Sequence, residues 1–514
     1  MNTLNLSRLT LAITATLATT TAFAAGLDRS GQNTTAFFQD GLYAEAVYTY
    51  IDGDVTGYDN AAISDEEKNV KGNKVESIIE TYDFFRFGVK DDINDKWSVG
   101  VLYDEPWGAA VKYSGENNFV ATDADTSINK LTKGLVPNMA AAPTVIPAAV
   151  QQIDAGIAKY EAGIAKADAG IAALEAGIAQ AEQAGQTDTV AALTKQKDAA
   201  MAGKSKAEAE KAGLESKKEK LPLTPFVAKA EGETEGEGTN VEVRSNSLTG
   251  ILGYKFGENN NFQVYGGPVL QRTQGNIKLR GAAYGGSTGY DAHISPDTSL
   301  GWLAGVAYYK PEIALKAALT YRSEIDHEAN VDESVPVGKD LGVSSDDAGH
   351  IAITTPESIN FDFQTGLNQT TLLTANVRYV PWSNFTITPP KYNALTKEST
   401  KDDKGLPIAN YSDDQWKVDL GLAKRLNDKL AVSGGIGWDS GAGNPTSSLG
   451  PVEGYYSAGL GAKYNITDNW AVSAGGKYLW FGDAEAALPN ENLVGNFEDN
   501  NGFVAAVKLS YQEK

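Results

Sequence analysis

The sequence predicts an all-β transmembrane barrel of about 14 antiparallel strands, with a short N-terminal hatch and a long helical hairpin inserted in its second outer loop. Three observations predict it: an N-terminal signal peptide, apolar rows that repeat every second residue, and short turns that alternate with long polar loops. The chain of 514 residues has no cysteine and a net charge of -22. These values exclude thiol chemistry and make a nucleic-acid partner unexpected.

Residues 1–24 have the composition of a secretory signal peptide. Arg8 precedes an apolar, Thr- and Ala-rich run that ends in Ala22-Phe23-Ala24, the small-x-small pattern of a cleavage site. We expect cleavage near Ala24. Beyond this segment the sequence has no run of about 18 apolar residues. A secreted chain of this kind is periplasmic, released, or an outer-membrane barrel.

The predicted strands have two different faces. One parity of a typical strand carries Leu430, Val432, Gly434, Ile436 and Trp438, apolar or small residues that end in an aromatic. The opposite parity of other predicted strands carries polar residues, as in Lys316-x-x-x-Thr320-x-Arg322. Apolar residues with aromatic ends facing lipid, and polar residues facing the lumen, are typical of a transmembrane barrel. The alternative is a soluble sandwich with one wet face.

Turn and loop lengths set the strand count. Six short polar turns, such as Leu426-Asn427-Asp428, alternate with seven long polar stretches, which requires an even number of strands. We place fourteen strands near 42–52, 77–90, 96–106, 240–255, 262–276, 298–309, 313–326, 355–366, 370–383, 415–425, 429–439, 453–464, 469–481 and 502–511. The predicted domains are therefore a hatch at 25–40, strands one to three at 41–113, an insertion at 114–238, and strands four to fourteen at 239–514.

The insertion contains a strict seven-residue repeat. Ala-Gly-Ile-Ala occurs four times, starting at 155, 162, 169 and 176, and Leu193 begins a second series at the same spacing. This heptad pattern predicts an antiparallel coiled-coil hairpin over about 148–221, with Gly185 at its turn and Pro222 after its end. It would serve as an adhesive or docking stalk, or as a lid. Alternatively, it is a surface insertion without a role in transport.

Residues for catalysis are sparse. The three histidines are His293, His327 and His350, all in or beside predicted outer loops. His327 follows Asp326 and is the nearest candidate for a hydrolytic site, but an ordinary loop histidine is the simpler interpretation. We expect no enzyme activity, no cofactor and no metal site.

Several segments, in the right order, resemble the long-chain fatty-acid outer-membrane transporter family (FadL-like). Ala318–Glu324 is similar to that family's Ala-Leu-Thr-Tyr-Arg-Ser segment, and Thr355–Ser358 to its Leu-Pro-Glu stretch. Val380–Phe385 and the hairpin Trp416–Trp438 are similar as well. The resemblance covers roughly 42–113 and 240–511.

The resemblance implies a barrel that is plugged by its N-terminal hatch and that releases an apolar ligand sideways through a kinked third strand. Here that strand contains Pro106, Trp107 and Gly108. Proline has no N–H for the ladder, and glycine has no side chain, so both favour a strand break. Alternatively, Pro106 begins the outer loop. In the hatch, Ser30, Gly31, Phe37 and Phe38 are the residues that we expect to enter the lumen.

The resemblance also implies a cation that binds the ligand's carboxylate at the end of the fifth strand, with a register uncertain by one or two residues. For each cation, simple solvation in the lumen is the alternative. The candidates in this stretch are Arg272, Lys278 and Arg280, and the inward-facing Arg322, Arg378 and Lys417 of other strands are the alternatives.

Two departures from the family pattern stand out. The hatch is shorter than in the family, and the chain ends Tyr511-Gln512-Glu513-Lys514 rather than on an aromatic. We expect passive outer-membrane transport of long-chain fatty acids or similar hydrophobic compounds. The expected partners are outer-membrane lipid, lipopolysaccharide and the barrel-assembly machinery, and the expected state is a monomer. The alternatives are an adhesive barrel that displays the hairpin, and a general porin.

Overall fold

The computed structural model describes residues 27–62, 69–340, 342–343 and 349–513. The predicted signal peptide lies outside these residues. The chain forms two compact units, a barrel unit of residues 1–121 and 236–514 and a helical unit of residues 122–235. Among the described helices, none combines the length and apolar character needed to cross a membrane.

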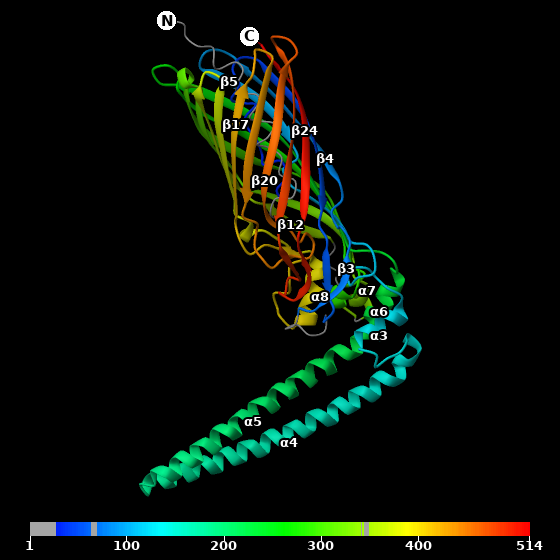
Figure 1. Ribbon diagram of the computed structural model, residues 1–514. Coiled ribbons are helices and arrows are strands. Elements are labelled where there is room, and N and C mark those ends of the chain that lie inside the picture. Colours follow the sequence, from blue (N-terminus) through cyan, green and yellow to red (C-terminus); the bar gives the residue numbers. More distant parts are fainter. Residues whose placement is uncertain (1–26, 63–68, 341, 344–348, 514) are drawn as a thin grey trace. The chain divides into compact units, whose positions relative to one another are not determined.

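The main sheet of the barrel unit closes on itself as an antiparallel ring (Figure 1). Counted over the described residues, the ring has fourteen strand positions, three of which hold two consecutive strands, and this confirms the predicted number. In ring order the strands are β1 (Tyr43–Asp54), β4 (Tyr82–Asp92), β5 (Trp97–Asp104) with β6 (Gly108–Lys112), β7 (Asn240–Phe256), β8 (Phe262–Lys278), β9 (Asp291–Lys310), β10 (Leu315–Arg322) with β11 (Ile325–Ser334), β12 (His350–Thr355) with β13 (Ser358–Asn368), β14 (Thr371–Val380), β17 (Gln415–Arg425), β18 (Leu430–Asp439), β20 (Glu453–Asn465), β21 (Trp470–Gly482) and β24 (Asn501–Gln512). Pairing of β1 with β24 closes the ring.

Alternation along each strand produces the two faces. Leu460 and Ile436 are 75% and 62% exposed on the outer surface, whereas the lumen-facing Lys463 and Ser473 are buried. Large apolar side chains at such exposure fit a surface that lipid surrounds. Aromatic pairs such as Trp470 with Tyr511 lie at the ends of the outer rows. The predicted orientation of apolar and polar parities is confirmed.

Several strands extend further than the sequence predicts. β9 begins at Asp291 instead of 298, and β11 and β12 continue the next hairpin through 325–334 and 350–355. Their alternate residues, among them Ile294, Val331 and Ile351, are buried, so the same period-2 pattern continues into stretches that we expected to be loops. The loops at 277–297 and 328–353 are therefore shorter than predicted.

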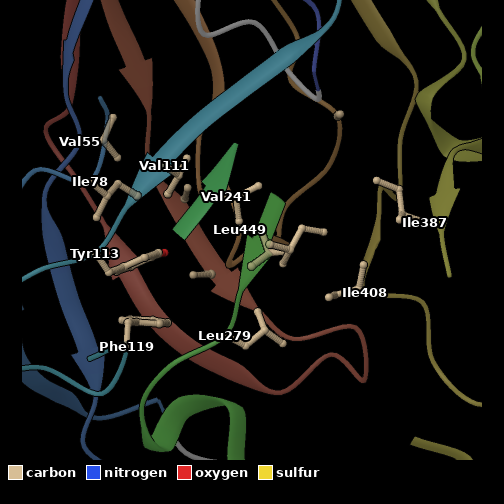
Figure 2. Packing of buried hydrophobic residues seen from close by; sticks show 14 of the residues in the cluster. Val55, Ile78, Val111, Tyr113, Phe119, Val241, Leu279, Ile387, Ile408 and Leu449 are labelled. Carbon is tan, nitrogen blue, oxygen red and sulfur yellow. The ribbon is translucent and has the colours of Figure 1, made fainter. Parts of the chain in front are cut away.

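The end of the barrel with the long loops has a packed apolar cluster. Short strands form one extra sheet there, β2 (Gly57–Asn60), β3 (Lys71–Val75), β19 (Thr446–Ser447), β22 (Ala484–Ala487) and β23 (Leu493–Phe497), and another from β15 (Thr386–Ile387) and β16 (Ala409–Asn410). Helix α8 (Pro390–Thr400) lies in the loop that contains β15 and β16, and helix α7 (Pro336–Asp340) lies in the loop between β11 and β12. Figure 2 shows Val241 of a barrel strand beside the loop residue Leu449, and Ile387 of β15 on the side of Ile408; all four belong to the cluster, as does Val111.

The helical unit is a long hairpin with a small base. Its helices are α3 (Ala124–Leu131), α4 (Ala142–Gln183), α5 (Thr187–Lys220) and α6 (Thr224–Glu233). Gly185 lies between the two long helices with φ of 66°, a conformation that favours glycine. Helix α5 begins at Thr187, and no side chain caps its first turn. Helix α5 ends at Lys220, before Pro222, as the sequence predicts.

Four ion pairs at seven-residue spacing connect the two long helices. They are Asp154–Lys218, Glu161–Lys211, Asp168–Lys204 and Glu175–Lys197, with N–O distances of 2.6, 3.0, 2.6 and 3.4 Å. Leucines of α5 pack onto glycines of α4: a Cβ on Gly156 would lie 2.9 Å from Leu214, and one on Gly177 would lie 3.3 Å from Leu193. The repeat thus sets one antiparallel register.

Candidate functional site

The segment before β1 enters the barrel lumen. Of its described residues, Ser30, Phe37 and Phe38 are at most 3% exposed. The rings of Phe37 and Phe38 pack on Tyr265 of β8, with centroids 5.6 and 5.2 Å away. Gly31 has a φ of 64°, so the backbone turns here in the left-handed region that glycine tolerates. This segment, residues 27–40, is called the hatch below.

An ion pair fixes the start of the hatch to the opposite wall. The Asp28 carboxylate accepts hydrogen bonds from Nε and Nη2 of Arg378 on β14 at 2.8 and 3.0 Å. Both side chains are at most 1% exposed. Gln32 Oε1 accepts from Ser358 Oγ at 2.6 Å and from Arg378 Nη2 at 3.2 Å. The Asn360 amide donates to the Gly31 carbonyl at 2.8 Å. A buried, bidentate charged pair of this kind is strongly directional.

The third strand position is broken at Pro106. β5 ends at Asp104 and β6 begins at Gly108, and both pair with β7. Three residues, 105–107, lie opposite two residues of β7, which makes a bulge. Ser245 of β7 bonds to the bulge. The Trp107 N–H donates to the Ser245 Oγ at 2.8 Å, and the Ser245 N–H donates to the Trp107 carbonyl at 3.0 Å. The strand continues past Pro106, so Pro106 does not begin the outer loop.

The same break interrupts the ladder between this strand and β4. The register runs to Phe87 opposite Tyr103 and resumes only with the bridge between Ile79 and Val111. Across this interruption the Glu105 carboxylate accepts hydrogen bonds from the Tyr82 hydroxyl at 3.2 Å and from the Phe85 N–H at 3.4 Å. Side-chain bonds therefore replace backbone bonds at this place in the wall.

The hatch pairs directly with the broken strand. The Gly108 N–H donates to the Leu27 carbonyl at 2.8 Å, and the Arg29 N–H donates to the Pro106 carbonyl at 2.8 Å. Asp28 and Trp107 form the bridge between them. Ser30 Oγ donates to Asp104 Oδ2 at 2.9 Å, at the end of β5. The hatch and the break in the third strand position thus form one hydrogen-bonded unit. Arg378 holds the same hatch segment from β14, on the other side of the lumen.

A small cavity lies beside this unit. It has a volume of about 60 Å³, and it is lined by Asp28 and Arg29 of the hatch, Gly108–Val111 of β6, Tyr411, and the loop 442–452. A second cavity of the same volume lies next to Phe38, against the lumen-facing Gly421 and Gly435. Pockets at a plug, with apolar walls and a few polar groups, suit small apolar ligands.

The three cations predicted near the end of the fifth strand do not form one lumen-facing site. Arg272 and Lys278 are exposed, on the parity of β8 opposite to the buried Gln271 and Ile277, so they do not face the lumen. The cause is the register: a one-residue offset puts a side chain on the other face of a strand. Arg280 is buried but pairs with Glu237 at 2.9 Å and Asp291 at 2.7 Å.

The two inward arginines differ in their partners. Arg378 is engaged with Asp28, as described above. Arg322, 4% exposed, donates to Thr249 Oγ1 at 3.2 Å, and its Nε has no hydrogen-bond partner among the described residues. Lys417, the further inward residue, pairs with Asp419 at 3.2 Å. Of these candidates, Arg322 best combines burial, a lumen position and the lack of an ion pair within the described chain.

His327 lies buried inside the barrel. Its Nδ1 is 2.9 Å from Asp297 Oδ2 and its Nε2 is 3.2 Å from Gln271 Oε1. These contacts join β8, β9 and β11. Over the described residues, no group of three or more metal-ligating side chains is brought together.

Sequence reasoning missed the residues that connect the hatch to the wall. Asp28, Glu105 and Ser245 are all central to the unit, yet none belongs to a motif. Asp28 lies two residues from Ser30, which we did single out. The signal that was available was a charged pair, Asp28-Arg29, in a segment expected to enter a lumen.

The chain is similar to known outer-membrane proteins. A model of the outer membrane protein transport protein family (OMPP1/FadL/TodX) matches residues 224–512, more than half of the chain. The solved structure of a Pseudomonas aeruginosa FadL homologue is 13% identical, covers 96% of this chain and 99% of its own, and has a TM-score of 0.55. A TodX deltaS2S3 mutant monoaromatic hydrocarbon channel is 11% identical, with coverage of 96% and 98% and a TM-score of 0.50. No curated protein sequence matches.

Proposed function

Because the chain belongs to the outer membrane protein transport protein family (OMPP1/FadL/TodX), whose members move hydrophobic compounds across the outer membrane, we propose that it carries long-chain fatty acids or similar hydrophobic compounds inward. Transport is passive: the ligand binds in the lumen, the hatch moves, and the ligand leaves sideways through the broken third strand. The chain is an outer-membrane β-barrel, which puts that strand next to lipid.

The observation that carries this proposal is the pairing of hatch residues 27–29 with the break at 106–108. Here the backbone of the plug completes the ladder that Pro106 and the bulge interrupt. When the hatch withdraws, the Gly108 N–H and the Pro106 carbonyl lose their partners and the wall loses its inner support. One movement therefore clears the lumen and exposes the break to lipid.

The charges near the hatch favour an amphiphile with an acidic head group. Arg322 offers a buried guanidinium with an unsatisfied Nε, and charge-assisted hydrogen bonds to carboxylates are among the stronger polar contacts in proteins. The apolar tail would lie against Phe37, Phe38 and Tyr265. A neutral aromatic hydrocarbon would use the apolar surfaces alone.

The test is uptake in cells that lack their own outer-membrane fatty-acid transporter. Expression of the chain should restore growth on oleate and uptake of labelled oleate. A Pro106→Val variant, which returns a backbone N–H to the interrupted ladder and leaves the tightly packed Gly108 unchanged, should take up oleate more slowly. Normal uptake by that variant would contradict lateral release.

A general porin would behave differently. In liposomes, a porin supports swelling in arabinose, whereas a barrel with its hatch seated should not. Swelling at porin-like rates would overturn the proposal. The helical hairpin is tested separately by deleting 145–225: unchanged oleate uptake with lost surface binding would make it an adhesive element, and lost uptake would make it part of ligand capture.

A further inference from the structure

A row of cationic side chains lies along the lumen face of five neighbouring strands. Five neighbouring strands put residues at one pairing level: Arg86 on β4 opposite Val47 on β1, then Lys508 on β24, Ser473 on β21 and Lys463 on β20. Directly opposed residues of antiparallel strands point to the same face. All five side chains are buried on the lumen face, and three of them are cationic.

The row has too few counter-charges. Glu45 is near it and pairs with Arg86 Nη2 at 3.3 Å and with Lys508 Nζ at 3.5 Å. The Tyr43 hydroxyl also donates to Glu45, at 2.7 Å. Lys463 has no ion pair in the described part of the chain, and the charged group that faces it is Lys508, of like sign. Glu45 thus pairs with Arg86 and Lys508, and Lys463 is a third buried cation beside them.

Two further donors at this level have no acceptor. Ser473 Oγ and Arg86 Nε are buried, and among the described residues neither has a hydrogen-bond partner. Ser473 is 1% exposed and lies between Lys463 and Lys508 in the register. A buried donor without a partner costs free energy, as does a buried charge without compensation. An anion with two or more oxygens that bound beside these side chains would accept hydrogen bonds from both donors and would compensate the charge of Lys463.

The wider distribution of charge supports an anion. The whole chain has 66 acidic and 44 basic side chains, yet among its buried charged residues the cations outnumber the acids. The buried cations are Arg29, Arg86, Lys90, Arg280, Lys316, Arg322, Arg378, Lys417, Lys463, Lys477 and Lys508, and the buried acids are Asp28, Glu45, Asp59, Asp104, Glu231, Asp419 and Asp439. The interior therefore favours anions although the chain as a whole is acidic.

We infer that Lys463, Lys508, Ser473 and Arg86 form a binding site for an oxyanion, which is either a carboxylate or a phosphate group. The site lies in the half of the lumen next to the short turns. The two lysines supply charge, and Ser473 and Arg86 supply directed donors. The site is separate from Arg322 and Arg378, and it stands whether or not the chain carries fatty acids. Its occupant is a small carboxylate, the head group of an amphiphile, or free phosphate.

The test compares three probes on the purified full chain in detergent at constant ionic strength: sodium octanoate, inorganic phosphate and neutral 1-octanol, each followed by calorimetry. The wild type should bind at least one of the two anions with a 1:1 stoichiometry. Lys463→Met should weaken that binding at least tenfold, and Ser473→Ala a few-fold. Lys429→Met, which removes an exposed turn lysine, is the matched control and should bind as the wild type does.

The outcomes are distinguishable. Octanoate without phosphate indicates a carboxylate site, phosphate alone indicates a free anion, and octanol should not respond to Lys463→Met. In buffer without either anion, Lys463→Met should be no less heat-stable than the wild type, because it removes an uncompensated charge. If the wild type binds neither anion, or if Lys463→Met binds both as tightly as the wild type, the inference is wrong. A loss of stability in Lys463→Met with unchanged anion binding would make the lysine purely structural.

Discussion

The carboxylate of Asp28 and the guanidinium of Arg378 meet in the lumen as a two-point ion pair, with N–O distances of 2.8 and 3.0 Å. The two residues are 350 positions apart in the chain. This pair connects the start of the hatch to β14, while the backbone on either side of Asp28 bonds to the broken strand. Asp28 therefore connects two sides of the barrel.

Replacing Asp28 by Asn should loosen the hatch. Removing one partner of a buried ion pair costs about 3–5 kcal/mol, because the remaining charge is left uncompensated. We expect higher ion conductance of the variant in planar bilayers than of the wild type. Asp91→Asn, at an exposed position near a short turn, is the control. Identical conductance of folded Asp28→Asn and wild type would show that the pair does not hold the hatch.

Replacing Arg322 by Gln should weaken binding of oleate about tenfold or more, since charge-assisted hydrogen bonds contribute roughly 1.5–3 kcal/mol. Binding of methyl oleate should change little, because the ester has no charge. Arg272→Gln is a matched control, since Arg272 is exposed on the other face of its strand. Fluorescence titration of the purified barrel measures both ligands. Equal losses for acid and ester would exclude Arg322 as the carboxylate partner.

Glycines of the hairpin should respond differently to alanine. Outside the backbone of α4 itself, no atom lies within 4 Å of a Cβ placed on Gly163 or Gly170, so alanine there should stabilise α4 by about 1 kcal/mol per site. At Gly156 the new Cβ would lie 2.9 Å from Leu214, which offsets the gain. Hydrogen exchange of the helix amides in the full chain should slow in Gly163→Ala and Gly170→Ala. Equal slowing in Gly156→Ala would contradict the packing.

The hairpin should lose stability in strong alkali. A hydrogen bond to Asp168 raises the pKa of Lys204, and hydrogen bonds to Glu161 and Asp154 likewise raise the pKa of Lys211 and Lys218. A raised folded-state pKa contributes stability that is complete below the ordinary value of 10.5 and is lost as pH rises through the folded-state value. Thermal melts of the helical circular dichroism should shift down between pH 10 and 12.

The control for the pH series is Lys204→Met, which removes one of the titrating lysines. Its melting temperature should fall less steeply over the same range than that of the wild type. A melting temperature that does not change between pH 10 and 12 would mean that the ion pairs do not stabilise the hairpin.

The barrel could be predicted from the sequence because the pattern that marks each strand lies within that strand's own residues. A period of two, aromatic row ends and turn residues recur in every strand, so each strand could be placed from its own residues. The strand break at Pro106 was also visible locally, as a proline followed by a glycine. Strand ends were harder, because the alternation of Ala329 and Val331 continues into a stretch whose polar residues resemble a loop.

The contacts of the site could not be predicted in the same way, because they join residues that are far apart in the chain. Nothing near Asp28 specifies Arg378 as its partner, and nothing near Pro106 specifies Leu27. The cationic row likewise depends on the register of five strands, since Arg86 and Lys463 share one level only once the barrel is closed. Arg272 shows how strongly the position of a side chain depends on register: a shift of one residue moves a side chain from the lumen face of the strand to the lipid face.

The central claim is that the hatch must leave the broken strand for ligand to pass, and a reversible cross-link tests it most directly. The chain has no cysteine, so Asp28→Cys with Trp107→Cys introduces one defined pair at bridge partners. Bridged antiparallel residues lie close enough for a disulfide. With the disulfide verified by mass, oleate uptake should be lost on oxidation and should return on reduction, while each single-cysteine variant stays insensitive to both treatments. Full uptake by the oxidised double variant would contradict the account.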